Sequence, residues 1–199
     1  MTHRSAPELL TLHAVRLLGY AATPRIADRF DLPPAAVEEH LLDAQAVGRI
    51  TYSSFGGDGG WSMTETGRAW GEQRLRAELD QAGACADVEQ VHEAFVPYNV
   101  TVSELCTAWQ LSELEVGDAR ADLITISAGL ASAADALAGF ETALTARLGR
   151  FAGYHRRFRG ALDRIDVDPG WITATDRDSC HRVWFEFHED LIATLGLTR

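Results

Sequence analysis

The sequence contains no lysine, and all 18 of its basic residues are arginine, against 29 acidic residues. Phosphate-binding loops of the Walker type, Schiff-base catalysis, the serine–lysine dyad and the protein-kinase phosphate site each need a lysine. These classes of enzyme are therefore excluded. We attribute the exclusive use of arginine to a GC-rich genome, which is a statement about coding and not about mechanism.

Cysteines and long apolar runs are also scarce. The three cysteines (Cys85, Cys106 and Cys180) are widely spaced and form no CxxC pair, so we expect reduced thiols and not a disulfide framework or a thiolate zinc site. No apolar run approaches the roughly 20 residues that span a bilayer. The first ten residues, MTHRSAPELL, have neither an apolar h-region nor a cleavage site. We therefore expect a cytoplasmic protein without a membrane partner.

The negative charge is divided unevenly along the chain. Residues 1–80 carry 8 Arg and 11 acidic residues, a net charge of −3, and residues 81–199 carry 10 and 18, a net charge of −8. Neither half offers the positive field on which nonspecific nucleic-acid binding relies. Gly83 follows a long polar helical pattern and can end that helix. We therefore predict two domains, 1–82 and 83–199.

The first half predicts four helices and a hairpin. The helices are expected at 8–19, at 23–30 with Thr23 as N-cap and Pro24 at the first helical position, at 34–47, and from the N-cap Thr64 to about residue 80. Alternating residues predict strands at 49–53 and 60–63. They place one set of side chains on a common face: Ile50, Tyr52, Trp61 and Met63. Residues 54–59 are expected to form a flexible hairpin tip.

This order of elements carries a family resemblance. The segment IADRFDLPPAAVEEHLLDAQAVGRI, followed by a hairpin and WSMTETG, resembles the winged helix-turn-helix of MarR/ArsR-like transcriptional regulators. The matched positions are Ile26, Ala27 and Phe30 on the support helix, Val37, His40 and Leu41 on the recognition helix, Gly48 before the wing, and Trp61, Met63, Thr64 and Gly67 after it. The resemblance covers residues 8–80. It implies a mainly α fold with a small β-hairpin wing, and a homodimeric regulator that binds double-stranded DNA.

The resemblance also implies which residues would contact DNA. In such a fold the recognition helix enters the major groove and the wing follows the backbone. The groove-facing positions are Pro34, Ala35, Glu38, Glu39 and Asp43, with His40 beside them. The candidate phosphate contacts are Arg25, Arg29, Arg49, Ser53 and Ser54, with Arg68 a further basic residue that could contribute.

The sequence departs from the family in its charges. No arginine occurs between Arg29 and Arg49, and Asp58 lies at the tip of the wing. The carboxylates on the reading face would repel phosphates, although glutamate can accept a hydrogen bond from cytosine N4. Two interpretations follow: a DNA-binding regulator, or a protein-interaction module that uses an acidic winged helix without binding DNA.

The second half is predicted to be entirely helical. Val88, Val91 and Phe95 form an apolar stripe that Pro97 interrupts or kinks, and a second helix continues it through Val102, Leu105, Cys106 and Trp109. A long alanine-rich helix is expected over 118–151, with breaks at Gly129 and Gly139 and a loop at 117–118. Another stripe includes Phe151, Tyr154, Phe158, Leu162 and Ile165. Asp178 is expected to cap a final helix over 179–195. Such a domain would supply dimerisation, effector binding or both.

The candidate effector site gathers aromatic, imidazole and basic residues of this half. His181, Trp184, Phe185 and His188 are spaced for one helix face, and Arg156, Arg157 and Arg159 could bind an anionic effector. The complete candidate set for a small-molecule effector is Tyr98, Asn99, Trp109, Arg156, His181, Trp184 and His188. The alternative is a packed core helix and a solvated basic face.

Neither metal binding nor catalysis has a suitable motif here. His181 and His188 are seven residues apart, about 10.5 Å along a helix, which is too far to share one metal ion. Cys180 and His181 are adjacent, so their side chains point about 100° apart. We therefore expect no metal, no cofactor and no enzymatic activity.

Overall fold

The structure is a computed structural model that describes residues 2–114 and 122–197. It is mainly helical and contains a small three-stranded antiparallel sheet. The chain forms two compact units, each with its own core. The first comprises Met1–Cys85, Leu148–Arg150 and Ile192–Arg199, and the second comprises Ala86–Arg147 and Phe151–Leu191.

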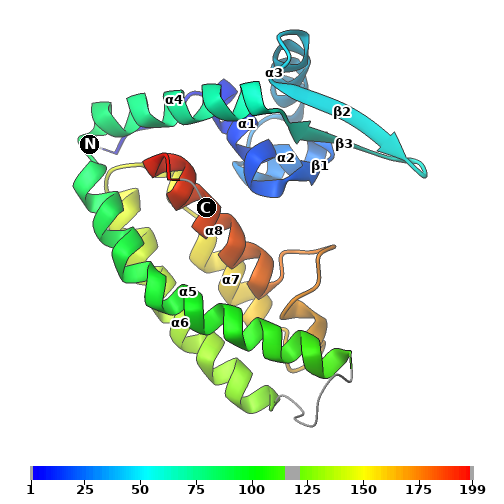
Figure 1. The fold of residues 1–199 in the computed structure, drawn as a ribbon, viewed down its shortest axis with the longest axis vertical. Coiled ribbons are helices and arrows are strands. Elements are labelled where there is room, and N and C mark those ends of the chain that lie inside the picture. Colours follow the sequence, from blue (N-terminus) through cyan, green and yellow to red (C-terminus); the bar gives the residue numbers. More distant parts are fainter. Residues whose placement is uncertain (1, 115–121, 198–199) are drawn as a thin grey trace. The chain divides into compact units, whose positions relative to one another are not determined.

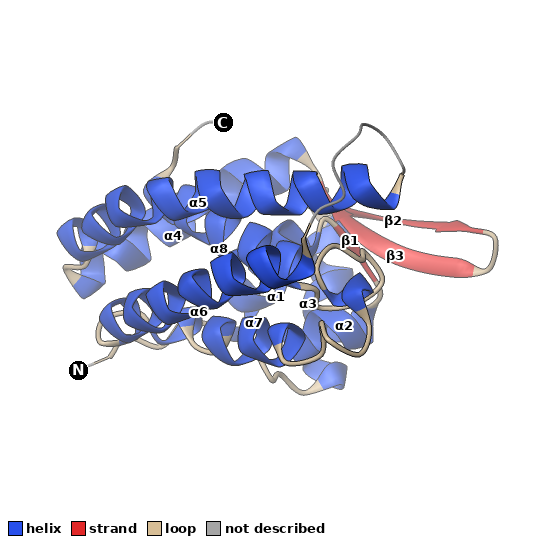
Figure 2. Ribbon diagram, turned by 90° about the horizontal axis from the view of Figure 1, so that it is seen from below, coloured by secondary structure: helices blue, strands red, loops and turns tan. Residues whose placement is uncertain are grey.

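The first unit contains four helices and the sheet (Figure 1). Its elements are α1 (Pro7–Leu18), β1 (Tyr20–Ala21), α2 (Thr23–Arg29), α3 (Pro34–Ala46), β2 (Ile50–Phe55), β3 (Asp58–Met63) and α4 (Glu65–Ala82). The strand order is β1-β3-β2, and all pairs are antiparallel. The β2–β3 hairpin extends away from the helices of this unit, as Figures 1 and 2 both show.

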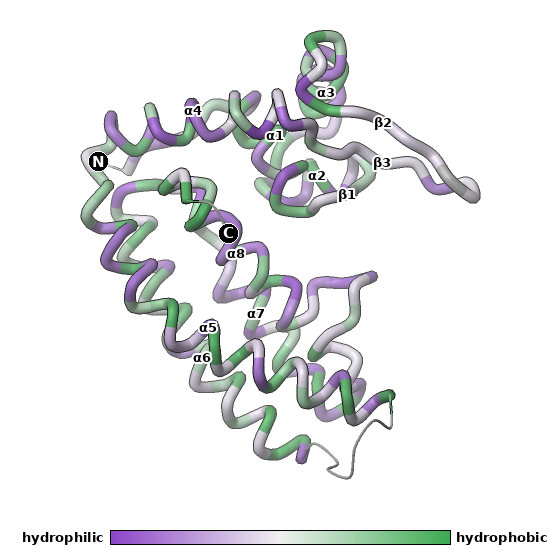
Figure 3. The backbone as a smooth tube through the Cα atoms, in the orientation of Figure 1, coloured by the Kyte–Doolittle hydropathy of each residue, from purple (hydrophilic) through white to green (hydrophobic). Residues whose placement is uncertain are grey.

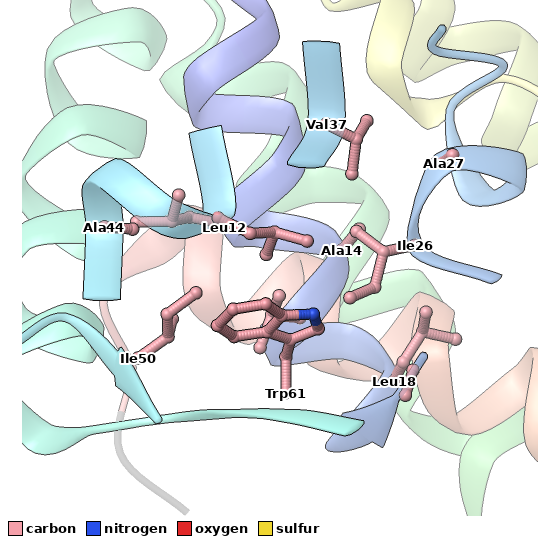
Figure 4. Packing of buried hydrophobic residues seen from close by; sticks show 12 residues of the cluster. Leu12, Ala14, Leu18, Ile26, Ala27, Val37, Ala44, Ile50 and Trp61 are labelled. Carbon is pink, nitrogen blue, oxygen red and sulfur yellow. The ribbon is translucent and has the colours of Figure 1, made fainter. Parts of the chain in front are cut away.

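The core of the first unit forms around Trp61. Its indole is 4% exposed and lies among residues from α1, α2 and β2, including Leu12, Ile26 and Ile50 (Figure 4). The register pairs Ile50 with Met63 and Tyr52 with Trp61, which confirms that these four residues share one face of the hairpin. Burying a side chain of this size stabilises the fold by about 2–3 kcal/mol.

The ends of two helices test the expected caps. Thr64 caps α4, because its hydroxyl accepts a hydrogen bond from Gly67 N at 3.1 Å. The cap expected at Thr23 is wrong: Ala22 is the N-cap of α2 and Thr23 is already helical. The expected hairpin tip is too long, since Ser54 still belongs to β2 and only Gly56 and Gly57 separate the strands.

Two short segments from the C-terminal half belong to the first unit. Arg150 donates to Glu78 of α4 at 2.8 Å and to Thr194 at 2.6 Å, and Gly149 N donates to His3 O at 3.0 Å. The unit boundary after Cys85 lies three residues from the expected division at 82/83. The sequence division nevertheless missed these segments, because the contacts of Arg150 with Glu78 and of Gly149 with His3 join residues more than 70 positions apart.

The second unit is built from four helices and a short 3-10 turn. They are α5 (Cys85–Glu113), α6 (Leu123–Thr145), α7 (Tyr154–Leu162), η2 (Pro169–Trp171) and α8 (Cys180–Leu195). Another 3-10 turn, η1 (Gly149–Phe151), has its first two residues in the first unit. α5 begins at Cys85 of the first unit, and α8 ends within the first unit.

Three helix predictions in this unit need correction. Pro97 lies inside α5, which continues as a single helix. α6 runs through Gly129 and Gly139 without a break and ends at Thr145; the expected start at residue 118 and the loop at 117–118 lie outside the described residues. At the start of α8, Arg182 N donates to Ser179 Oγ at 3.3 Å, whereas Asp178 accepts from Arg157 Nε.

α6 also corrects the expectation about apolar runs. Among the described residues it is the one helix long and apolar enough to cross a membrane by length and composition (Figure 3). Only 28% of its most apolar 18-residue window is buried. Its buried residues, including Ile126, Leu130 and Leu137, belong to the core of the second unit. Length and composition do not distinguish a membrane span from a helix of a helical domain.

Candidate nucleic-acid interface

The expected groove-facing residues lie on the exposed side of α3. Val37, Leu41 and Ala44 are buried in the core of the first unit. On the other side are the exposed residues Pro34, Ala35, Glu38, Glu39, Leu42 and Asp43, with His40 half-buried. The helical period thus leaves one face of α3 available for a partner.

A hydrogen-bonded chain links this face to the sheet. Thr23 Oγ1 donates to Glu38 Oε2 at 2.8 Å, and Trp61 Nε1 donates to Thr23 Oγ1 at 3.1 Å. The chain connects α3, α2 and β3 through one hydroxyl. Glu38 therefore orients α3 relative to the hairpin, in addition to carrying charge. Sequence reasoning missed this role, because it assigned the threonine to helix capping.

Two of the expected arginine contacts are engaged within the unit. Arg29 is buried, with its guanidinium 4.4 Å from the centre of the Phe30 ring. Arg49 donates to Glu8 at 3.1 Å and lies over the Trp70 ring at 4.2 Å. Arg29 is therefore withdrawn from solvent, and part of the hydrogen-bonding capacity of Arg49 is used within the unit. Arg25 is half-buried on α2.

The two expected serine contacts are exposed. Ser53 and Ser54 lie on β2 near the end of the hairpin, where their hydroxyls can donate to a phosphate oxygen. Asp58 begins β3 close by and is also exposed. The hairpin therefore combines neutral donors with one negative charge.

Two tyrosines brace the hairpin. Tyr20 on β1 donates to Ser53 O at 3.0 Å, and its ring covers Gly60 so closely that a Cβ there would lie 2.6 Å from a ring carbon. A Cβ at Gly59 would lie 1.8 Å from the Tyr52 hydroxyl. A side chain at either glycine would therefore displace the tyrosine ring that covers it. Sequence reasoning placed Tyr52 on the same face of the hairpin as Trp61 but missed Tyr20, for which a Gly-Gly pair within a strand was the available signal.

Part of the candidate effector set comes together in the second unit, as packed core. Trp184 Nε1 donates to Asn99 Oδ1 at 3.1 Å. The Phe95 ring lies 4.9 Å from Trp184 and 5.1 Å from His188. Tyr98 contacts Phe140, which belongs to the same aromatic cluster. These contacts match the alternative of a core helix, because the rings fill the space between α5, α6 and α8.

The other effector candidates lie apart from this cluster. Arg156 is exposed on α7, and none of the ring contacts in the described chain joins Trp109 to the cluster. His181 N donates to Ile172 O, and burial lowers the pKa of its imidazole. Phe185 is exposed while Trp184 is buried, so the four residues expected on one face of α8 do not share it.

The basic stretch on α7 is largely neutralised. Arg157 donates to Asp178 at 2.8 Å and lies 2.7 Å from Glu186. Burial lowers the pKa of this guanidinium, but attraction to Glu186 and the interactions with Asp178 together outweigh that effect and raise the pKa above its usual value. Arg159 pairs with Asp163 at 3.0 Å. Of the three arginines considered for an anionic effector, only Arg156 has no such pair among the described contacts.

Two of the three thiols are deeply buried. Burial raises the pKa of Cys106 to about 12 and also raises the pKa of Cys180, so both remain protonated and unreactive near neutral pH. Within residues 2–114 and 122–197, no three His, Cys, Asp or Glu side chains lie close enough to hold a metal ion.

No protein-family model matches this sequence, and no curated protein or solved structure matches it either.

Proposed function

We propose that the first unit is a winged helix-turn-helix and that the protein is a DNA-binding transcriptional regulator. The order α1-β1-α2-α3-β2-β3-α4, with strand order β1-β3-β2, is the observation that carries the proposal. In this layout α3 is the recognition helix, α2 supports it and the β2–β3 hairpin is the wing. The exposed side of α3 and the extended hairpin support this assignment.

The contacts would depend on neutral groups more than on arginine. In the first turn of α3, which begins at Pro34, the backbone N–H groups of Ala35 and Ala36 and the helix dipole would favour a phosphate, whereas the prolines have no N–H to offer. Ser53 and Ser54 would bind the backbone from the wing, and Arg25 would approach it from α2. Because few cations take part, binding would be weak at physiological salt and would depend little on salt concentration.

The second unit would supply dimerisation. Its aromatic residues fill a core, so the contacts favour a structural role over the effector site considered from the sequence. Many DNA-binding regulators read two half-sites through a two-fold axis, and a helical unit can provide that axis. We therefore propose a homodimer.

A gel shift with DNA from upstream of the protein's own gene tests the proposal. Ala35→Glu adds a carboxylate to the exposed first turn of α3, where glutamate also suits the helix. We expect it to weaken binding at least about 10-fold, because the new charge would face phosphate. Ala69→Glu makes the same change at an exposed position of α4 and should leave binding unchanged. Equal shifts for both variants would contradict the assignment of α3.

A second candidate function is docking of a protein partner on α3. The observation that favours it is the exposed trio Glu39, Leu42 and Asp43, since an acidic face with an apolar residue suits a basic protein surface better than phosphate. Glu39→Arg with Asp43→Arg reverses this charge. A bound protein that the wild type retains and the variant loses would support docking; a gain of DNA retention by the variant would favour the first function.

A further inference from the structure

A cavity of about 160 Å³ lies within the first unit, between the segment that leads into α1 and the second half of α4. Ala6, Leu9 and Ala77 give it apolar walls, and Trp70 adds an aromatic surface. Its volume equals that of about five water molecules, which is room for a small organic molecule and not for a peptide or a drug-sized ligand. We call this space the α1–α4 cavity.

Opposite charges line the α1–α4 cavity from its two sides. Arg74 lines it from α4, and Glu8 lines it from α1. The two side chains are not paired with each other. Among the described residues, Glu8 pairs with Arg49 at 3.1 Å, and Arg74 forms neither an ion pair nor a side-chain hydrogen bond. A cationic and an anionic group therefore border the same space without neutralising each other.

Both groups keep hydrogen-bonding capacity for a ligand. The Arg74 guanidinium is exposed and lies 5.5 Å from the centre of the Trp70 ring, a contact that leaves its N–H groups able to donate to a carboxylate. The Glu8 side chain is 43% exposed and accepts one hydrogen bond, from Arg49. An ionised carboxylate has about four acceptor sites, so Glu8 can accept from a further donor.

A buried carboxylate lies one helical turn beyond Arg74. Glu78 also lines the cavity, and its side chain is only 4% exposed. Its Oε2 accepts from Arg150, whereas its Oε1 accepts no hydrogen bond from the described residues and lies 3.4 Å from His3 Nε2. A buried acceptor without a hydrogen bond lowers stability. An ammonium group in the cavity would supply the missing donor once the imidazole of His3 turns aside.

We propose that the α1–α4 cavity binds a free, neutral α-amino acid with a small apolar side chain. Arg74 holds the carboxylate of the ligand, and Glu8 and Glu78 accept from its ammonium group. Arg74 and Glu78 are four residues apart, about 6 Å along the axis of α4, which suits the short separation of the two charges in an α-amino acid. The apolar side chain of the ligand lies against Leu9 and Trp70. This site goes beyond the proposed function, because it needs no DNA.

Isothermal titration calorimetry of the full chain with L-alanine, L-valine and L-leucine tests the site. At least one of them should bind with a dissociation constant below about 1 mM. Arg74→Gln removes the partner of the ligand carboxylate and should weaken this binding about 10-fold or more, since a hydrogen bond between charged groups is lost. Arg76→Gln is the matched control, because Arg76 is exposed on the same helix, pairs with Asp80 and does not line the cavity. It should leave the affinity unchanged, and circular dichroism should show both variants folded, since neither position is buried.

Two related compounds then test whether the site recognises both charges. The N-acetyl derivative of the tightest-binding amino acid lacks the ammonium group, and the corresponding primary amine lacks the carboxylate. Each should bind about 10-fold more weakly or worse. The proposal is overturned if none of the three amino acids binds at about 10 mM, or if Arg74→Gln binds them as tightly as the wild type. Equal binding of the N-acetyl derivative would also overturn it, because that result indicates a simple anion site. The titrations contain no DNA, so this proposal and the proposed function can fail separately.

Discussion

The buried ion pair between Arg150 and Glu78 offers a sharp test of the two-unit organisation. The Arg150 side chain is 0% exposed and that of Glu78 is 4% exposed, and the two are joined by a 2.8 Å hydrogen bond. Arg150→Met keeps much of the length of the side chain but removes the buried guanidinium, which leaves the Glu78 carboxylate with the His3 imidazole at 3.4 Å as its remaining basic neighbour. Removing one partner of a buried pair costs about 3–5 kcal/mol. We therefore expect the first unit to lose this amount of unfolding free energy.

Urea unfolding followed by circular dichroism measures this loss. Replacing both partners, as Glu78→Leu with Arg150→Met, removes the unpaired charge and should recover most of the stability. Arg76→Met is the control on α4, because the Arg76–Asp80 pair is more than half exposed and contributes less than about 1 kcal/mol. A loss below about 1 kcal/mol for Arg150→Met would contradict the assignment of residues 148–150 to the first unit.

Two further predictions concern the second unit. Gly139→Ala should stabilise the protein by about 0.5–1 kcal/mol, because nothing lies within 4 Å of the added Cβ. Gly129→Ala should be less favourable, because its Cβ would lie 2.5 Å from a methyl group of Leu105 on α5 and that side chain must shift. Thermal unfolding compares the two variants, and equal effects would contradict the packing of α6. In the folded protein near pH 8, the thiols of Cys106 and Cys180 should resist a disulfide reagent, because burial raises the pKa of both, while the half-buried Cys85 should react. In urea all three thiols should react, and rapid labelling of all three in the folded state would refute this burial.

Local signals in the sequence predicted most of the helices. The expected recognition helix at 34–47 agrees with α3 at Pro34–Ala46, because proline at its start and glycine after its end mark both boundaries. The alternation around Ile50 and Trp61 predicted the face of the hairpin, since a strand repeats every two residues. Helix boundaries and strand faces of this kind are determined by residues close together in the sequence.

Contacts between residues far apart in the sequence explain the predictions that failed. Pro97 does not end α5, because burial of Phe95 and Val102 on either side holds the helix together despite the lost hydrogen bond. Arg29 was predicted to contact phosphate, but in the fold it is buried and lies over the Phe30 ring. This burial depends on the folded core and leaves no local signal in the sequence. Thr23 fits the pattern of an N-cap, yet in the fold its hydroxyl is taken by Glu38.

The most direct test of the central proposal is the salt dependence of DNA binding by fluorescence anisotropy. The exposed side of α3 carries no arginine, and Arg29 and Arg49 are engaged within the first unit. The account therefore predicts saturable binding at low salt, with a slope of log affinity against log salt no steeper than about −3. Absence of binding at low salt would contradict DNA recognition by this unit. A slope near −6 or steeper would contradict the neutral contacts assigned to α3 and the wing.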